Sequence, residues 1–153
     1  MRKIITILLL LCLSVSLMQA QITIGGNIYG GGNAGDLTGK TTVNIYAGDL
    51  NRVYGGARMA DVGGRAFMNI DGAHASGYIV INRLYGGNDI AGTIGKSNDE
   101  LPDVIKPHAA ANEVDNTWNA LMLISTKTKA YGNEVDDAKE IYIGQLFGGG
   151  NGD

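Results

Sequence analysis

A short motif returns through the chain, in which an aliphatic residue and an aromatic ring are followed directly by glycines. Its copies stand at residues 28–32, 53–56, 84–87 and 146–150. The first two copies agree beyond the glycines, because an offset of 25 residues brings Tyr29 onto Tyr54 and Asn44 onto Asn69. A repeat of this length predicts a solenoid or another array of stacked units.

Glycine is the most unusual part of the composition, with 24 residues in a chain of 153, clustered between runs rich in Ile, Val and Tyr. The glycines lack a three-residue period, which excludes collagen. A hydrophobic fraction of 44% argues against a disordered linker. We therefore expect an all-β fold: a β-solenoid, in its simplest form a right-handed parallel β-helix with irregular coils and loop excursions. The alternative is a β-sandwich, against which the 25-residue offset argues.

Residues 1–20 have the pattern of a secretory signal peptide. Arg2 and Lys3 precede an apolar run at 4–17, and Ala20 offers a small residue for cleavage before Gln21. The run is short for a membrane anchor, since a spanning helix needs about 20 apolar residues. We expect export to the cell surface or the medium, with no membrane insertion after the signal is removed.

The charge of the remaining chain limits its partners. Removal of the signal leaves 10 basic and 15 acidic residues, a net charge of −5, which argues against nucleic acid as a partner. The single cysteine, Cys12, lies in the signal, so the exported chain has no disulfide with which to stabilise its fold.

The exported part, residues 21–153, is predicted to be one glycine-rich repeat domain. The expected strands lie at 22–24, 27–29, 41–46, 50–54, 67–70, 78–85, 118–125 and 140–147, with polar excursions at about 97–117 and 126–139. A solenoid needs a terminal cap, and no polar cap follows the last motif. We therefore expect either the N-terminal part of a longer protein or an open edge that pairs with a partner, including edge-to-edge self-association.

Strand alternation places the aliphatic and aromatic members of each motif on opposite faces. With Val53 in the core, Tyr54 is predicted to face outward, and the same applies to every copy. The predicted outer row consists of Tyr29, Tyr54, Tyr85 and Phe147, with Arg52 and Arg83 beside it. Aromatic faces next to hydrogen-bonding groups suit sugar rings. The alternative is that the rings stack on one another at a corner for stability alone.

The carboxylates give weak support for chemistry. Asp36 and Asp61 occupy equivalent positions, so they are the candidate pair for calcium binding or glycoside hydrolysis. The third copy shifts its aspartate to Asp89, and Ala34 replaces a glycine that calcium-binding nonapeptide repeats need. We expect no metal, no cofactor and no enzymatic activity.

The sequences Tyr-Gly-Gly-Gly-Asn at 29–33 and Tyr-Gly-Gly-Asn-Asp-Ile-Ala-Gly at 85–92, together with the signal, resemble a group of glycine-rich repeat proteins exported by bacteria. That group is uncharacterised or adhesin-like, and β-helical surface proteins are its nearest described relatives. The resemblance covers most of residues 22–153 and transfers no site residues. Export, the repeat architecture and the predicted row of Tyr and Arg side chains together lead us to expect a non-enzymatic, adhesin-like surface protein that binds glycan or protein through a stacked aromatic face. The alternatives are a structural spacer and a polysaccharide-degrading enzyme on a β-helix.

Overall fold

A computed structural model describes residues 21–96, 103, 106, 118–125 and 140–151. Its elements are all β-strands, so the predicted all-β class is confirmed over these residues. The strands are β1 (Thr23–Tyr29), β2 (Thr41–Ile45), β3 (Gly48–Tyr54), β4 (Ala66–Asp71), β5 (Ile79–Tyr85), β6 (Ala120–Ser125) and β7 (Ile141–Phe147). The predicted signal peptide (1–20) and most of the two predicted excursions lie outside the described residues and stay predictions.

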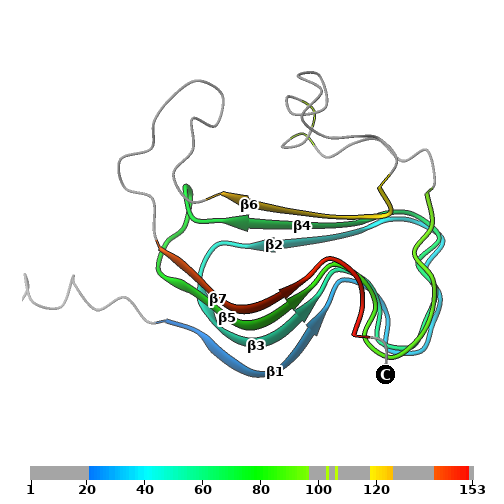
Figure 1. Ribbon diagram of the computed structural model, residues 1–153, viewed down its shortest axis with the longest axis horizontal. Helices are drawn as coiled ribbons and strands as arrows, with labels where there is room; N and C mark the ends of the chain where they lie inside the picture. The colour runs from blue at the N-terminus through cyan, green and yellow to red at the C-terminus, as the bar shows by residue number, and fades with distance from the viewer. Residues whose placement is uncertain (1–20, 97–102, 104–105, 107–117, 126–139, 152–153) are drawn as a thin grey trace, which may run out of the picture.

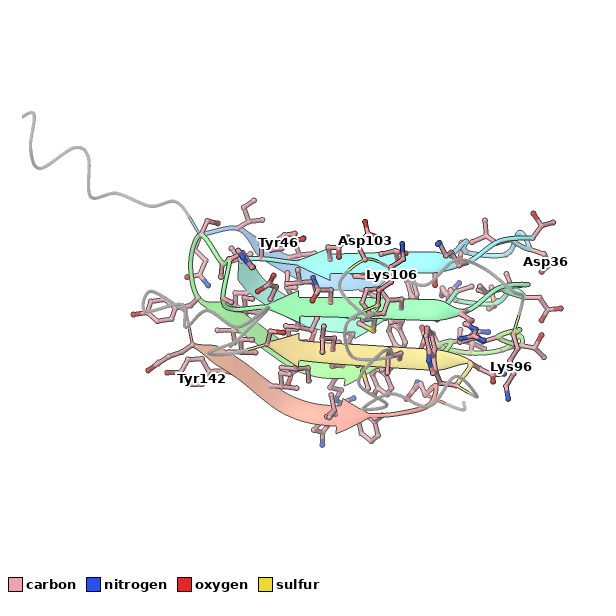
Figure 2. The ribbon with its side chains drawn as sticks, turned by 90° about the horizontal axis from the view of Figure 1, so that it is seen from above. Asp36, Tyr46, Lys96, Asp103, Lys106 and Tyr142 are labelled. Carbon is pink, nitrogen blue, oxygen red and sulfur yellow. The ribbon has the colours of Figure 1, made fainter. Side chains whose placement is uncertain are left out.

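The chain alternates between two parallel sheets that face each other (Figure 1). The odd-numbered strands form a four-stranded sheet in the order β1-β3-β5-β7, and the even-numbered strands form a three-stranded sheet in the order β2-β4-β6. Figure 2 shows the strands of the three-stranded sheet, which is the upper sheet in Figure 1, side by side in chain order. Each strand pairs in parallel with the strand two places on. Parallel pairing separates this fold from the β-sandwich, whose sheets are antiparallel.

The sequence correspondences at the 25-residue offset are register pairs in the sheets. Tyr29 lies opposite Tyr54, and Asn44 lies opposite Asn69. Outside the strands, Leu37 forms an isolated parallel bridge with Val62. One pass of the chain consists of a glycine corner and one strand of each sheet. The 25-residue offset in the sequence is therefore the length of chain after which the second pass stacks on the first.

The core lies between the two sheets and is built from aliphatic side chains of both. In β2, Val43 and Ile45 are buried while the intervening Asn44 is exposed, as alternation along a strand predicts. In the middle strand β4, the register partners Met68 and Ile70 are completely buried. Burial of one such side chain stabilises the fold by about 1.5–3 kcal/mol.

The outer face of the three-stranded sheet is also covered at its centre. Phe67 of β4, between the core residues Ala66 and Met68, is only 2% exposed. Asp103 and Lys106 form an ion pair of 2.8 Å between Oδ1 and Nζ, and Figure 2 shows them over this sheet. These two residues belong to the first predicted polar excursion, and their side chains are 92% and 45% exposed.

Glycine backbones make the closest approach between successive passes. At Gly55, a Cβ atom would lie 2.5 Å from the carbonyl oxygen of Gly86, and Gly30 and Gly86 are equally crowded by the next pass. A backbone hydrogen bond of 2.9 Å from the Gly55 N–H to the Tyr85 carbonyl holds this spacing. At the same motif position in the last copy, a Cβ on Gly148 would meet no atom within 4 Å.

Within the described residues, β1 and β7 are the edge strands of the four-stranded sheet, and their side chains are correspondingly exposed. Leu146 in β7 is 53% exposed, although its register partner Leu84 in β5 is fully buried. The same apolar position is therefore fully buried in the middle of the sheet and about half exposed at its edge.

The crowding at Gly55 leads to the first prediction. Gly55→Ala should lower the free energy of unfolding by about 1–3 kcal/mol, because the added methyl forces two backbones apart. Gly148→Ala is the matched control and should change it by less than about 1 kcal/mol. Chemical denaturation of both variants measures the difference, and equal losses would contradict the close approach.

Candidate functional site

The aromatic members of the motif form one continuous stack where the four-stranded sheet meets the glycine corners. Tyr29, Tyr54, Tyr85 and Phe147 share one register position. Successive ring centroids are 5.1, 4.6 and 4.7 Å apart, and the ring planes differ by at most 15°. At these distances each inner ring has both faces covered by its neighbours.

The prediction that these rings face outward is wrong for the two inner ones. Tyr54 is 0% exposed and Tyr85 is 3% exposed. Each of these rings lies between two neighbouring rings of the stack, which cover both of its faces. Alternation also breaks earlier in the strand, because Leu50 and Val53 both enter the core although they are three residues apart.

The outer ends of the stack are more open. Phe147 is 40% exposed and Tyr29 is half-buried. Because β7 is the edge strand, the face of Phe147 turned away from Tyr85 lacks a ring partner among the described residues. A sugar or a side chain can reach a ring face of this stack only at its ends.

The predicted arginines lie in register beside the stack, and both are half-buried. Their row consists of Asn27, Arg52, Arg83 and Gln145. Arg52 lies close enough to the Tyr54 hydroxyl to favour its ionised form. Next to the exposed ring of Phe147, the polar member of the row is Gln145, which is itself exposed.

Asp89 ties the phenol group of Tyr29 to the third corner. Its carboxylate is almost fully buried, and Oδ2 accepts a hydrogen bond of 2.7 Å from the Tyr29 hydroxyl. Oδ1 faces the side-chain amide of Asn151 at 3.3 Å. The Tyr29 oxygen in turn accepts a bond of 2.9 Å from the Asn27 amide. A buried charge is stable only when it is hydrogen-bonded, and these contacts meet that requirement.

Burial and Asp89 together keep the tyrosines protonated. Burial raises the pKa of Tyr54 to about 12, and the neighbouring Asp89 carboxylate adds to the effect. Burial also raises the pKa of Tyr29, and its bond to Asp89 acts in the same direction. The Tyr29 hydroxyl therefore acts as a donor to the carboxylate rather than as a base.

Asn88 is the second corner residue whose structural role the sequence left open. Its Oδ1 accepts a bond of 2.8 Å from the Ala57 N–H, and its Nδ2 donates to the Ala60 carbonyl at 3.2 Å. The signal for both residues was the pair Asn-Asp after the third glycine motif, where the second copy has Ala57 and Arg58. Burial alone distinguishes them from ordinary turn residues.

The aspartates proposed as a calcium or catalytic pair hold the backbone of the next pass instead. Asp36 Oδ1 accepts the N–H of Asp61 at 2.8 Å, and Asp61 Oδ1 accepts the N–H of Thr93 at 2.7 Å. The third member of this series is therefore Thr93, and Asp89 lies outside the series, as its shifted position in the sequence indicated. Asp36 lies at the corner end of the molecule, far from Tyr46 at the other end (Figure 2).

Two further features are missing from the described part of the chain. No group of three or more His, Cys, Asp or Glu side chains there is placed to hold a metal ion. No helix there has the length and apolar character needed to cross a membrane.

A hollow of about 450 Å³ lies over the third corner. Its floor contains Ile90, Ala91 and Ile94, and its sides include Ala120 and the glycine backbone of residues 148–150. Asn88 and Asp89 also line it, with their side chains engaged as described above. The hollow is mostly apolar, which does not resemble the ring of carboxylates that a cation would need.

No protein-family model matches the chain, and searches for similar curated proteins and similar solved structures find no significant match. The functional argument therefore depends on the geometry of this chain.

The buried stack leads to the second prediction. Tyr54→Ala should lower the free energy of unfolding by about 3–5 kcal/mol, as for other large core aromatics. Tyr142, on β7 outside the stack, is 54% exposed, so Tyr142→Ala should cost less than about 0.5 kcal/mol. Thermal melts of both variants test this, and a small loss for Tyr54→Ala would mean that the ring is not a core residue.

The third prediction concerns Asp61. Its pKa lies below the usual value, first because of the Thr93 N–H and then because of the Thr93 hydroxyl. The ionised Asp61 carboxylate therefore stabilises the folded state. This contribution is fully present above the ordinary pKa of about 3.9 and is lost as the pH falls through the lower pKa of the folded state. Thr93→Val keeps the N–H and removes the hydroxyl, so the Asp61 pKa should rise part of the way. An NMR titration of the carboxyl measures it, and an unchanged pKa would show that the hydroxyl contributes nothing.

Proposed function

We propose that this chain is an exported, non-enzymatic, adhesin-like repeat protein that binds a glycan or a protein at the end of its aromatic stack. The proposed architecture is a β-solenoid, in its simplest form a right-handed parallel β-helix. Its support is the strict alternation of the chain between two parallel sheets, with each strand placed beside the one two places earlier. Crossover connections between parallel strands are right-handed in nearly all proteins.

Export is supported by the sequence of residues 1–20, with its basic start and apolar run. The chain has no cysteine outside this segment, so after export it would have no disulfide to stabilise it. Its stability comes instead from stacked backbone and buried side chains, which also suits a protein exposed outside the cell.

The observation that carries the binding proposal is the exposure of Phe147. Its ring is held within 8° of parallel to Tyr85 at 4.7 Å, so its orientation is fixed before any ligand arrives. A fixed aromatic face loses little entropy on binding. Beside it, the exposed Gln145 offers an amide that can donate and accept hydrogen bonds. An apolar face with a polar group at its edge matches the two sides of a sugar ring.

A structural spacer is the second candidate. It is favoured by the burial of Tyr54 and Tyr85, which are used for packing and not for contact with a ligand. A polysaccharide-degrading enzyme has less support, because the acceptor oxygens of Asp36 and Asp61 that face the next pass are occupied by backbone N–H groups. A catalytic pair needs two carboxyl groups directed at one bond of the substrate.

The fourth prediction tests the exposed ring. On a glycan array and on a panel of immobilised extracellular-matrix proteins, Phe147→Ala should weaken binding by about tenfold or more, a change of about 1.4 kcal/mol. Phe147→Tyr keeps the ring and should retain binding. Tyr142→Ala removes another exposed aromatic of β7 and should also retain it.

If the unaltered chain binds nothing on either panel, or if Phe147→Ala binds as the unaltered chain does, the binding proposal is wrong and the spacer is favoured. Melting temperatures of all variants must stay close to that of the unaltered chain. Because Phe147 is at the exposed end of the stack, we expect this condition to be met.

A further inference from the structure

Beside β6, the three-stranded sheet has room for a further strand of the same pattern. In the described residues the three-stranded sheet ends at β6, while the four-stranded sheet continues to β7. The chain crosses from one sheet to the other through a glycine corner, and the corner after β7 is described as far as Asn151. The position above β6 and above the third corner is the place that the next corner and strand of the same pattern would occupy.

The hollow over the third corner continues an aliphatic row. Leu37, Val62 and Ile94 are bridged in sequence, one from each pass. Val62, with neighbours on both sides, is 0% exposed, whereas Leu37 at the outer end is 38% exposed. Ile94 is only partly buried and lines the hollow of about 450 Å³. The hollow therefore lies where a further aliphatic side chain would cover Ile94 as Ile94 covers Val62.

The core between the sheets is incomplete at the same end. Met122 and Ile124 of β6 are in register with Met68 and Ile70 of β4. The β4 residues are fully buried, but Met122 and Ile124 are only partly buried. An added strand with aliphatic residues at these positions would remove this surface from water.

The backbone of β6 is oriented for such an addition. The N–H groups of Ala66 and Gly72 donate to the carbonyls of Asn119 and Ser125. In a parallel ladder, residues that point to one neighbour alternate with residues that point to the other. The N–H and C=O groups of Ala120, Met122 and Ile124 therefore point toward the other edge. An edge of this kind is a template for another strand.

We propose that this end of the molecule accepts an extended polypeptide segment that carries the corner-and-strand pattern of residues 59–71, added in parallel to β6. The segment needs an aliphatic residue to cover Ile94, aliphatic residues at two alternate strand positions to cover Met122 and Ile124, and glycine in between. Glycine is required because Gly63 and Gly95 approach so closely that a Cβ on Gly95 would collide with the Gly63 carbonyl. This site goes beyond the proposed function, since it uses the β6 edge and not the ring of Phe147.

The occupant is a peptide of this chemistry because every interface between passes in this molecule has the same composition. Backbone bonds, an aliphatic row and a glycine approach recur between β2 and β4 and between β4 and β6. The β6 surface continues that interface without a change of register. A sugar would satisfy neither the row of N–H and C=O groups nor the apolar surface of Ile94, Met122 and Ile124.

The test is a titration of the full chain with a synthetic peptide that copies residues 59–71. We expect saturable binding of one peptide per chain, a rise in melting temperature, and slower hydrogen exchange at the amides of Ala120, Met122 and Ile124. The control peptide carries Val62→Asp and should bind about tenfold more weakly or worse, because a carboxylate would then face Ile94.

Two chain variants localise the effect, since Leu37 and Ile94 are the two ends of one row. Ile94→Asp should weaken peptide binding by about tenfold or more, and Leu37→Asp should leave it unchanged. Both place a charge at a partly exposed end, so they control for a general loss of stability. If Ile94→Asp does not fold, the exchange data on the unaltered chain still decide the question.

The proposal is overturned if the peptide does not bind, or if the Val62→Asp peptide binds equally well. It is also overturned if the amides of Ala120, Met122 and Ile124 are already protected without peptide, because the edge is then covered by other parts of the chain. Multimers on a sizing column that the peptide fails to dissociate would assign the site to a second copy of the chain instead.

Discussion

The close approach of glycine backbones at the corners is the constraint on which the rest of the structure depends. At Gly55 a single added carbon would lie 2.5 Å from the next pass. Two backbones can come this close only where neither carries a side chain. Once the corners are in contact, the strands that lead into them must be parallel and in register. The aromatic stack follows from that register, because each ring precedes its glycine directly and so falls above the ring before it.

The same packing gives the polar residues of the corners a structural role. Where the chain turns, its N–H groups need acceptors, and buried donors left unpaired cost about 1–3 kcal/mol each. Asp36, Asp61 and Asn88 supply these acceptors from one pass to the next. Asp89 does the same for the Tyr29 hydroxyl. Because these groups are engaged in the fold, both proposals use the end of the stacked strands.

The sequence predicted the features that depend on spacing. The all-β class and the pairing of Tyr29 with Tyr54 follow from the 25-residue offset, which is independent of where any side chain points. It did not predict the burial of Tyr54, because alternation along a strand gives the face of a side chain but not what covers that face. Tyr54 is 0% exposed between the rings of Tyr29 and Tyr85, although Val53 before it is buried as well.

The corner aspartates show the same limit. The sequence leaves the third member of the series of Asp36 and Asp61 unassigned, because Asp89 is shifted out of register. The aliphatic bridge from Val62 to Ile94 shows that Thr93 takes the place of Asp61, and the Thr93 N–H donates to Asp61 as the Asp61 N–H donates to Asp36. A pattern of residue types therefore aligns less reliably than a row of apolar side chains, which must cover one another to be buried. This argument also separates the two proposed sites, which lie at the same end of the stacked strands. At Phe147 a rigid ring offers one face and little backbone, which suits recognition by shape. At β6 a row of backbone groups lies beside an incomplete apolar surface, and only another polypeptide can complete both.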